Sequence, residues 1–268
     1  MIGDEVFHVA VMPPSDLPSN LVSQIAQIVN QPEYQIRFQL AGHLPRMIGH
    51  FKEGTAANTA ARSLLALNLA AFVISESELR RTISPELSAH SIKIDGEESI
   101  FTNRNGKFKN LSNSNVFLIL TGRRSTVVEE ETVAKSTMKV NVTATLLTGG
   151  IPVMKRVVSK AQESKKITEQ FVRLYTKESD VPAVELCQFD LDYSFLGDKK
   201  GPTATGNINA SIDVLRQAFP KAFFDNSLLT GFVTDSKSIS GTDLGEQNCF
   251  LLVRYYKAMA NDSPGEAI

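Results

Sequence analysis

The hydrophobic pattern of the chain changes between residues 76 and 89, and this change restricts the folds that the chain can adopt. Before it, short apolar runs alternate with segments in which apolar residues recur every three or four positions. After it, extended runs rich in β-branched and aromatic residues follow one another closely. The first pattern is typical of strands alternating with helices, and the second of β-structure. The sequence therefore predicts an α+β fold: a small N-terminal α/β sandwich, a polar linker over 76–89, and a mostly antiparallel β domain.

The first predicted part, residues 1–82, alternates between the two periodicities. The predicted elements are, in order, strand 6–12, a helix starting at Asp16 or Ser19, a short helix opened by Pro32, strand 46–51, a helix marked by Ala57, Ala60, Leu64 and Leu67, and strand 70–75. The short helix carries Tyr34, Phe38 and Ala41 at spacings of four and three, which fit one helical face. This order predicts a small α/β domain.

The stretch "GHLPRMIGHFKEGTAANTAARSLLALNLAAFVIS" (42–75) resembles the second half of the C-terminal domain of the ribosomal stalk protein. The Clp protease adaptor that reads N-terminal residues is similar in fold. The resemblance implies this fold and a protein partner. Two segments depart from these families: "MPPSDLP" replaces the acidic Asn-Asp signature of the adaptor, and "YQIRFQLAG" replaces the lysine-rich helix of the stalk domain. No functional residue is therefore carried over.

The second predicted part, residues 88–220, contains short extended runs separated by turn residues. The predicted elements are strands 90–95, 98–103, 107–111 and 115–121, a hairpin of 169–176 with 183–197, and a helix over 206–220. Asn105-Gly106 predicts a hairpin turn in which both residues have positive φ. Strand 115–121 is apolar on both faces, which predicts a central strand, and Gly122 is expected to end it.

This order resembles a bacterial pleckstrin-homology-like domain, in particular over "IDGEESIFTNRNGKFKNLSNSNVFLILTGR". The resemblance implies four strands, an insertion over 125–167, about three further strands and a capping helix. That fold serves lipid-binding, peptide-binding and structural roles, so it does not fix the function. Residues 221–268 follow as a C-terminal extension, in which "NCFLLVRYYKAMA" fits either a helix or a strand.

The composition predicts a folded cytoplasmic protein. The net charge of −1 gives no general attraction to nucleic acid or to anionic lipid. No run approaches the roughly 18–20 apolar residues of a membrane span, and the N-terminus lacks the basic region of a secretory signal. Cys187 and Cys249 lie in apolar surroundings, as expected for buried thiols in a reducing compartment.

Four basic residues are candidate ligand contacts. Arg123 and Arg124 follow a predicted central strand, where guanidinium groups can meet a carboxylate or phosphate, or pair with Glu129, Glu130 or Glu131. Lys155 and Arg156 begin the basic segment "KRVVSKAQESKK" (155–166). Nearby, "LLTGGIPVMKR" lacks the spacing of a phosphate-binding loop, so a tight turn is expected at its glycines.

The sequence shows no pattern typical of catalysis, of a metal site or of a cofactor site. Asp190 and Asp192 are predicted to leave one face of a strand, but a metal site needs more ligands. His43 and His50 are close enough in sequence to meet. We therefore predict a non-enzymatic binding or adaptor protein that recognises a protein partner through its N-terminal part, and we do not expect a nucleic-acid partner.

Two alternatives stay open. One is an enzyme whose site is assembled from distant residues, with Arg123, Asp190, Asp192 and a histidine as first candidates. The other is binding of anionic lipid or nucleic acid through the basic insertion, which would depend steeply on salt.

Overall fold

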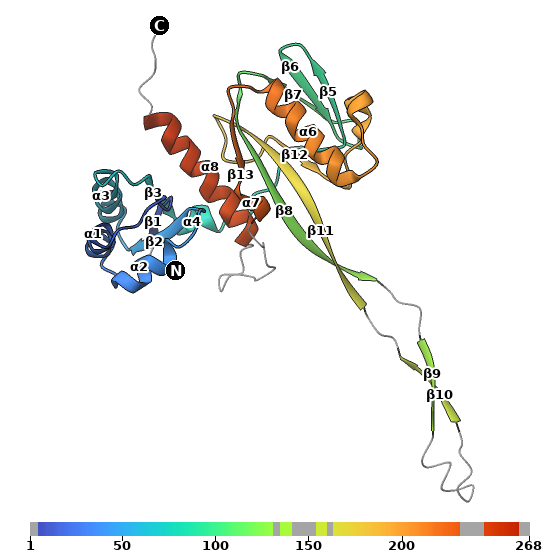
Figure 1. The fold of residues 1–268 in the computed structure, drawn as a ribbon, viewed down its shortest axis with the longest axis horizontal. Coiled ribbons are helices and arrows are strands. Elements are labelled where there is room, and N and C mark those ends of the chain that lie inside the picture. Colours follow the sequence, from blue (N-terminus) through green and yellow to red (C-terminus); the bar gives the residue numbers. More distant parts are fainter. Residues whose placement is uncertain (1–4, 131–134, 141–153, 160–162, 231–243, 263–268) are drawn as a thin grey trace, which may run out of the picture. The chain divides into compact units, whose positions relative to one another are not determined.

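The computed structural model describes residues 5–130, 135–140, 154–159, 163–230 and 244–262 (Figure 1). The fold belongs to the α+β class, as predicted. Contacts divide the chain into two units: Met1–Arg124 together with Glu169–Ile268, and Ser125–Thr168. The first unit contains an N-terminal module, residues 7–75, and a β domain, residues 88–124 and 169–226.

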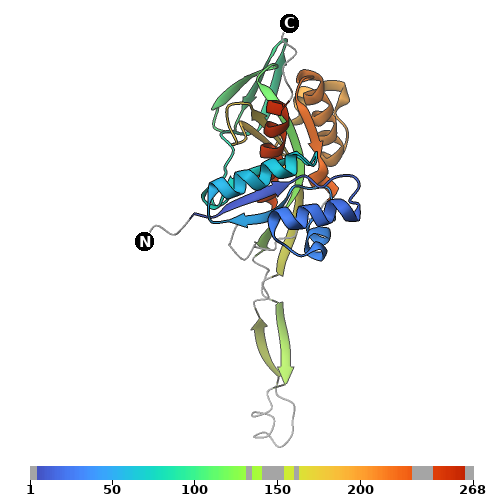
Figure 2. The same ribbon diagram turned by 90° about the vertical axis from the view of Figure 1, so that its left-hand side faces the viewer.

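The N-terminal module has the predicted order of elements. They are β1 (Phe7–Val11), α1 (Ser19–Val29), α2 (Glu33–Gln39), β2 (Arg46–Phe51), α3 (Gly54–Leu65) and β3 (Ala71–Ser75). The strands form an antiparallel sheet in the order β2-β1-β3. Helices α1 and α3 cover one face of it, where Val9 and Val11 pack against Ile25 and Leu64 (Figure 1, Figure 2). The apolar residues that alternate along the strands and those that recur every three or four positions along the helices thus form one core.

Helix α2 lies where the sequence predicts it, but its buried face differs from the predicted one. Ile36 and Leu40 are buried in the module core, whereas the side chains of Tyr34 and Phe38 are 75% and 83% exposed. Both pairs have a spacing of four, so each fits one stripe of a helix. Spacing alone could not decide which pair faces the core.

The segment 76–89, predicted from its polarity to be a linker, contains regular secondary structure. It contains α4 (Glu76–Leu79) and β4 (Ser88–Ala89). The Ser75 side chain accepts a hydrogen bond from the Glu78 N–H, and the Glu78 carboxylate accepts one from the Ser75 N–H. This reciprocal pair is a capping box, and its Ser-x-x-Glu pattern is visible in the sequence.

The β domain contains two sheets. The first holds β5 (Ser91–Asp95), β6 (Glu98–Thr102) and β7 (Phe108–Ser112) in an antiparallel meander. The second has the order β13-β8-β11-β12-β4, with β8 (Val116–Glu130), β11 (Glu163–Thr176), β12 (Val184–Cys187) and β13 (Phe223–Asn226). Its two end pairs, β13 with β8 and β12 with β4, are parallel, which the sequence analysis did not predict. Helix α6 (Ala204–Ala218) packs Ile208, Ile212 and Leu215 into the domain core.

The turn at Asn105-Gly106 joins β6 to β7 as predicted, but its geometry differs. Only Gly106 has a positive φ, 78°, whereas both turn residues were expected to have one. The Asn103 side-chain oxygen accepts hydrogen bonds from the N–H groups of Asn105 and Lys107. These hydrogen bonds from Asn103 stabilise the loop between β6 and β7, so the loop does not need a second residue with a positive φ.

Strand β8 does not end at Gly122; it continues to Glu130. A Cβ atom at Gly122 would lie 2.5 Å from Cζ of Phe171 and 3.0 Å from Cβ of Leu228. The glycine is therefore required by close packing of these side chains, and it does not terminate the strand.

The C-terminal extension forms β13, α7 (Ser227–Thr230) and α8 (Leu244–Asp262), so the ambiguous apolar run is helical. Phe250 and Leu251 of α8 pack with Ala10 and Ile74 of the N-terminal sheet. Among the described helices, none has the length and apolarity needed to cross a bilayer.

The second unit contains β9 (Lys135–Val140) and β10 (Met154–Ser159), which pair antiparallel. Their register places Lys155 opposite Lys139 and Arg156 opposite Met138. The predicted turn at Gly149-Gly150 lies outside the described residues.

Candidate functional site

Arg124, a predicted ligand contact, is engaged by groups of the β domain itself. Its Nε donates to Glu169 at 2.8 Å, its Nη1 to Glu185 at 3.1 Å and its Nη2 to the Cys187 sulfur at 2.9 Å. These partners lie on β11 and β12, the strands that follow β8 in the sheet. All three nitrogen atoms of the guanidinium thus have internal partners.

Arg173 extends this network into the core. The residue is 2% exposed, and its Nε donates to Glu185 at 2.7 Å. Its two terminal nitrogens donate to the Glu246 carboxylate of α8 at 2.6 Å each. Sequence analysis missed this residue, although a base within the apolar run "EQFVRLYT" is a usable signal, because a buried charge requires a partner.

The electrostatics of the network indicate a structural role. Burial opposes ionisation of Glu185, but the guanidinium groups of Arg173 and Arg124 hold its pKa below the usual range. Burial raises the pKa of the Cys187 thiol to about 12, so this sulfur is protonated near neutral pH. A protonated thiol is a poor nucleophile. The network stabilises the sheet and presents no reactive group.

The other predicted basic contacts are Arg123, Lys155 and Arg156. Arg123 is exposed on β8. Lys155 and Arg156 belong to β10, in the second unit.

Asp190 and Asp192 do not leave one face of a strand, because β12 ends at Cys187. Asp190 pairs with Arg104 at 2.6 Å, and its backbone carbonyl contacts His90 Nδ1. Asp192 accepts a hydrogen bond from the Ser194 N–H at 3.0 Å and so caps the 3-10 helix η1 (Tyr193–Lys199). The structure thus brings a histidine near both aspartates, but the carboxylates serve as an ion-pair partner and a cap.

Among the described residues, no group of three or more His, Cys, Asp or Glu side chains has the arrangement of a metal site. A cluster of two histidines does form in the N-terminal module. His50 meets His8, its cross-strand partner, and not His43 as its place in the sequence suggests. Strand register determines this contact across 42 positions of sequence.

The His8 ring links two groups. Its Nδ1 lies 2.7 Å from Nδ1 of His50, and its Nε2 lies 2.7 Å from a carboxylate oxygen of Glu76. The other Glu76 oxygen accepts from Arg80 Nε at 2.7 Å. Because a carboxylate only accepts, His8 donates through Nε2, and the two Nδ1 atoms share a single proton.

This proton sharing makes the pair sensitive to pH. Partial burial and the neighbouring His8 lower the pKa of His50, against an opposing effect of Glu76. If both rings were protonated, two N–H donors would face each other and the hydrogen bond would be lost. The pair is a proton-sensitive cross-strand contact.

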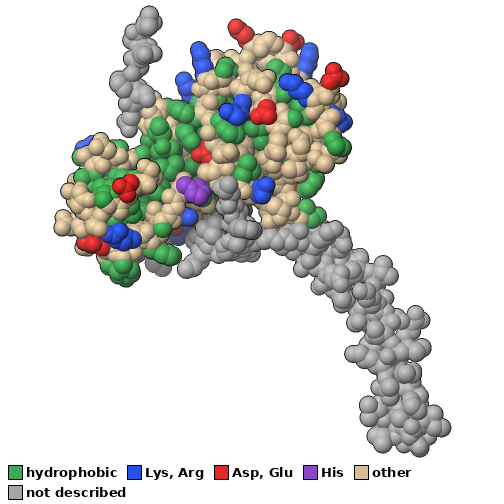
Figure 3. Space-filling view, viewed as in Figure 1, with side chains coloured by type: hydrophobic (Ala, Val, Ile, Leu, Met, Phe, Trp, Pro, Cys, Tyr) green, Lys and Arg blue, Asp and Glu red, His purple; other side chains and the backbone are tan. Residues whose placement is uncertain are grey.

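The most unusual surface feature is the α2 aromatic face, which consists of Tyr34 and Phe38. Both rings project into solvent, and hydrophobic side chains gather at the end of the module where α2 lies (Figure 3). Two side-chain bonds fix α2 against α1: Ser23 donates to Glu33 at 2.5 Å, and Arg37 donates to Ser19 at 2.9 Å. The aromatic rings are therefore presented on an anchored helix.

No family model, curated protein or solved structure matches the chain. The candidate sites are accordingly compared by their own geometry. The arginine–glutamate network is internally satisfied, whereas the rings of the α2 aromatic face are mostly exposed to solvent.

Proposed function

We propose that the protein is a non-enzymatic binding or adaptor protein that recognises a protein partner through the α2 aromatic face. The observation that supports this proposal is the exposure of Tyr34 and Phe38, 75% and 83%, on one short helix. Burying a large apolar side chain is worth roughly 1.5–3 kcal/mol, and these two rings forgo most of it in the free protein. A partner that covers them recovers this free energy.

The charges around the rings indicate the partner's chemistry. Arg37 precedes Phe38 and is exposed, and its guanidinium donates a hydrogen bond to a neutral residue, Ser19. The nearest acid on the helix, Glu33, already accepts from Ser23. Aromatic and arginine side chains dominate binding energy at interfaces. We expect a partner with an apolar pocket bordered by a carboxylate.

The enzyme alternative has less support from the geometry. Its candidates Asp190 and Asp192 serve as an ion-pair partner and a helix cap, and Arg123 is exposed on another strand. A catalytic group needs access to substrate and a suitable protonation state. The thiols of Cys187 and Cys249 are buried, and the carboxylates of Asp190 and Asp192 are engaged by Arg104 and Ser194.

Affinity capture with matched baits tests the proposed function. The baits are the full-length protein, the double variant Tyr34→Ser/Phe38→Ser, and the control Phe108→Ser, which removes an aromatic ring that is 64% exposed on β7. We expect the wild type and the control to retain the same protein, and the double variant to retain about tenfold less of it. Equal retention by all three baits would overturn the proposal.

A second candidate function rests on the charge of the second unit, Ser125–Thr168. This unit contains seven bases and four acids, whereas the rest of the chain contains 21 bases and 25 acids. In the β9–β10 register, the backbone of Lys155 pairs with that of Lys139. The unit has no aromatic residue for base stacking or for a membrane interface. Contact with the phosphate backbone of a nucleic acid fits this composition best.

Salt dependence tests this second candidate. Binding to a DNA duplex should weaken with rising salt by roughly 0.9 logarithmic units per phosphate contact. Replacing Lys155, Arg156, Lys160, Lys165 and Lys166 with Gln should abolish it. Binding that is unchanged in this variant, or binding to anionic vesicles and not to the duplex, would contradict it.

A further inference from the structure

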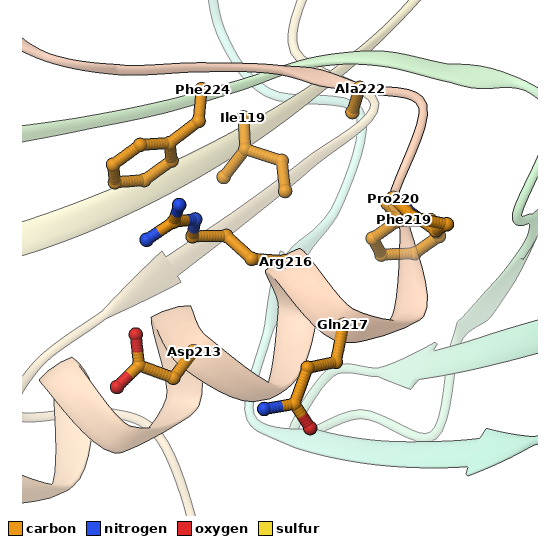
Figure 4. Close-up of a pocket in the computed structure, with 8 residues that line it drawn as sticks. All are labelled: Ile119, Asp213, Arg216, Gln217, Phe219, Pro220, Ala222 and Phe224. Carbon is orange, nitrogen blue, oxygen red and sulfur yellow. The ribbon is translucent and has the colours of Figure 1, made fainter.

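We propose that the cavity between α6 and β13 binds a small organic carboxylate that carries an apolar body. The cavity has a volume of about 480 Å³ (Figure 4). It is lined by Ile119, Asp213, Arg216, Gln217, Phe219, Pro220, Ala222 and Phe224. Ligand sites in proteins have volumes of about 300–1,000 Å³ and combine an apolar lining with a few polar groups. This inference is independent of the α2 aromatic face.

The apolar part of the cavity is built by the fold. Ile119 of β8 and Phe219, which follows α6, are each 1% exposed. The parallel pairing of β13 with β8 places Phe224 opposite Ile119. Phe224 and Ala222 come from the connection and strand that return from α6 to the sheet (Figure 4). Ile119 and Phe219 are covered, so the partly exposed Ala222 and Phe224 form the apolar surface that a ligand can contact.

The polar group of the cavity is Arg216. Its Cζ lies 4.4 Å from the centroid of the Phe224 ring, so the guanidinium stacks on the aromatic face. When a guanidinium stacks on an aromatic ring, the N–H donors at its edge remain available for hydrogen bonds and their directions are fixed. In the described parts of the chain no carboxylate lies within ion-pair distance of Arg216, although Asp213 is only three positions before it on the helix.

Three other arginines of the β domain, by contrast, pair with carboxylates. Arg124 and Arg173 each have two carboxylate partners, and Arg104 has one. Arg216 is the arginine that lines a cavity and has a hydrogen-bonding edge with no protein acceptor in the described residues. Its planar fork of donors matches the two oxygens of a carboxylate.

The surroundings favour a singly charged anion over a phosphate. A single guanidinium faces the cavity, and Asp213 also lines it. Arg216 lies in the last turn of α6, where the helix dipole is negative and disfavours multiply charged anions. In the same position, Arg216 could instead have a purely structural role and stabilise the helix end. The ligand-binding role predicts that affinity depends on the charge of the ligand, whereas the structural role predicts that it does not.

Titration of the full-length protein with three related probes separates these roles. The probes are benzoate, its neutral analogue benzamide and its cationic analogue benzylamine, followed by the amide NMR signals of Gln217, Ala222 and Phe224. We expect benzoate to shift these signals saturably and benzamide to bind about tenfold more weakly. Equal affinity for the three probes, or no saturable shift with benzoate, would overturn the proposal.

Variants complete the test. Arg216→Gln should weaken benzoate binding about tenfold. The control Arg104→Gln removes a guanidinium that is paired with Asp190, outside this cavity, and should leave binding unchanged. If Arg216→Gln does not fold, Arg216→Lys keeps the charge but loses the planar fork, and it should bind benzoate more weakly than the wild type. Wild-type affinity in a folded Arg216 variant would contradict the proposed site.

Discussion

The β domain and the N-terminal module each contain side chains in unfavourable surroundings, but only the β domain pairs them with neighbours of its own fold. The β domain buries Arg173 and Glu185 and gives each nearby opposite charges. The N-terminal module leaves the side chains of Tyr34 and Phe38 mostly exposed to solvent. A buried charge that is fully paired serves the fold that contains it. An exposed aromatic pair on an anchored helix contributes little to its own fold and is available to another molecule.

The largest expected effect comes from breaking the pairing in the β domain. Glu185→Ala would leave Arg173 buried with one carboxylate fewer and remove a partner of Arg124. Loss of one member of a buried ion pair costs about 3–5 kcal/mol, and we expect a decrease of this size in the free energy of unfolding. Glu86→Ala, which breaks the partly exposed pair with Lys109, should cost at most about 1 kcal/mol. Similar losses in both variants, measured by urea denaturation, would contradict the assigned role of the network.

A smaller effect is expected from filling the space beside β8. Gly122→Ala would place a methyl group 2.5 Å from the buried Phe171 ring, so the ring or the strand must move. Overpacking of this kind costs about 1–3 kcal/mol. Gly54→Ala, where the new atom meets Phe7 at 3.4 Å, should be neutral or stabilising because alanine favours a helix. Thermal unfolding of both variants decides whether Gly122 is a packing requirement.

The histidine pair should make the N-terminal module sensitive to acid. The pKa of His50 is lowered in the folded state from its ordinary 6.5, mainly by burial and then by His8. Its stabilising contribution is therefore complete above pH 6.5 and decreases as the pH falls towards the folded pKa.

His50→Gln should reduce this pH dependence, and the same replacement at His43, which precedes β2 and is not the cross-strand partner of His8, should not. The measurement is the free energy of unfolding at pH 8 and at pH 5.5 for the wild type and both variants. An identical decrease on acidification in the wild type and in His50→Gln would show that the pair has no such effect.

Replacing the aromatic rings of α2 should have the smallest effect on stability. Tyr34→Ser/Phe38→Ser removes side chains that are mostly in solvent, so the free energy of unfolding should change by no more than about 0.5 kcal/mol per substitution. A decrease of several kcal/mol in the free energy of unfolding, measured by urea denaturation, would show that the rings stabilise the module core. The contrast between the α2 aromatic face and the paired charges of the β domain would then be wrong.

Local sequence pattern predicted much of the fold and little of the sites. The order of elements in the N-terminal module follows from periodicity, because each helix and strand is a local pattern. The buried face of α2 does not, because Ile36/Leu40 and Tyr34/Phe38 have the same spacing. The carboxylate partners of Arg124 lie 45 and 61 positions away, and they are brought to it by strand pairing. Pairing across a sheet is a non-local choice that a single sequence does not reveal.

Photo-crosslinking from α2 tests most directly whether its aromatic face binds a partner. Phe38 is replaced by the photoreactive analogue p-benzoylphenylalanine in the full-length protein, and Phe108 on β7 is replaced in the same way as the matched position. Irradiation in native extract should produce a discrete heavier adduct from position 38 and none of that mass from position 108. The same adducts from both positions, or no discrete adduct from position 38, would contradict the proposal that α2 is the recognition surface.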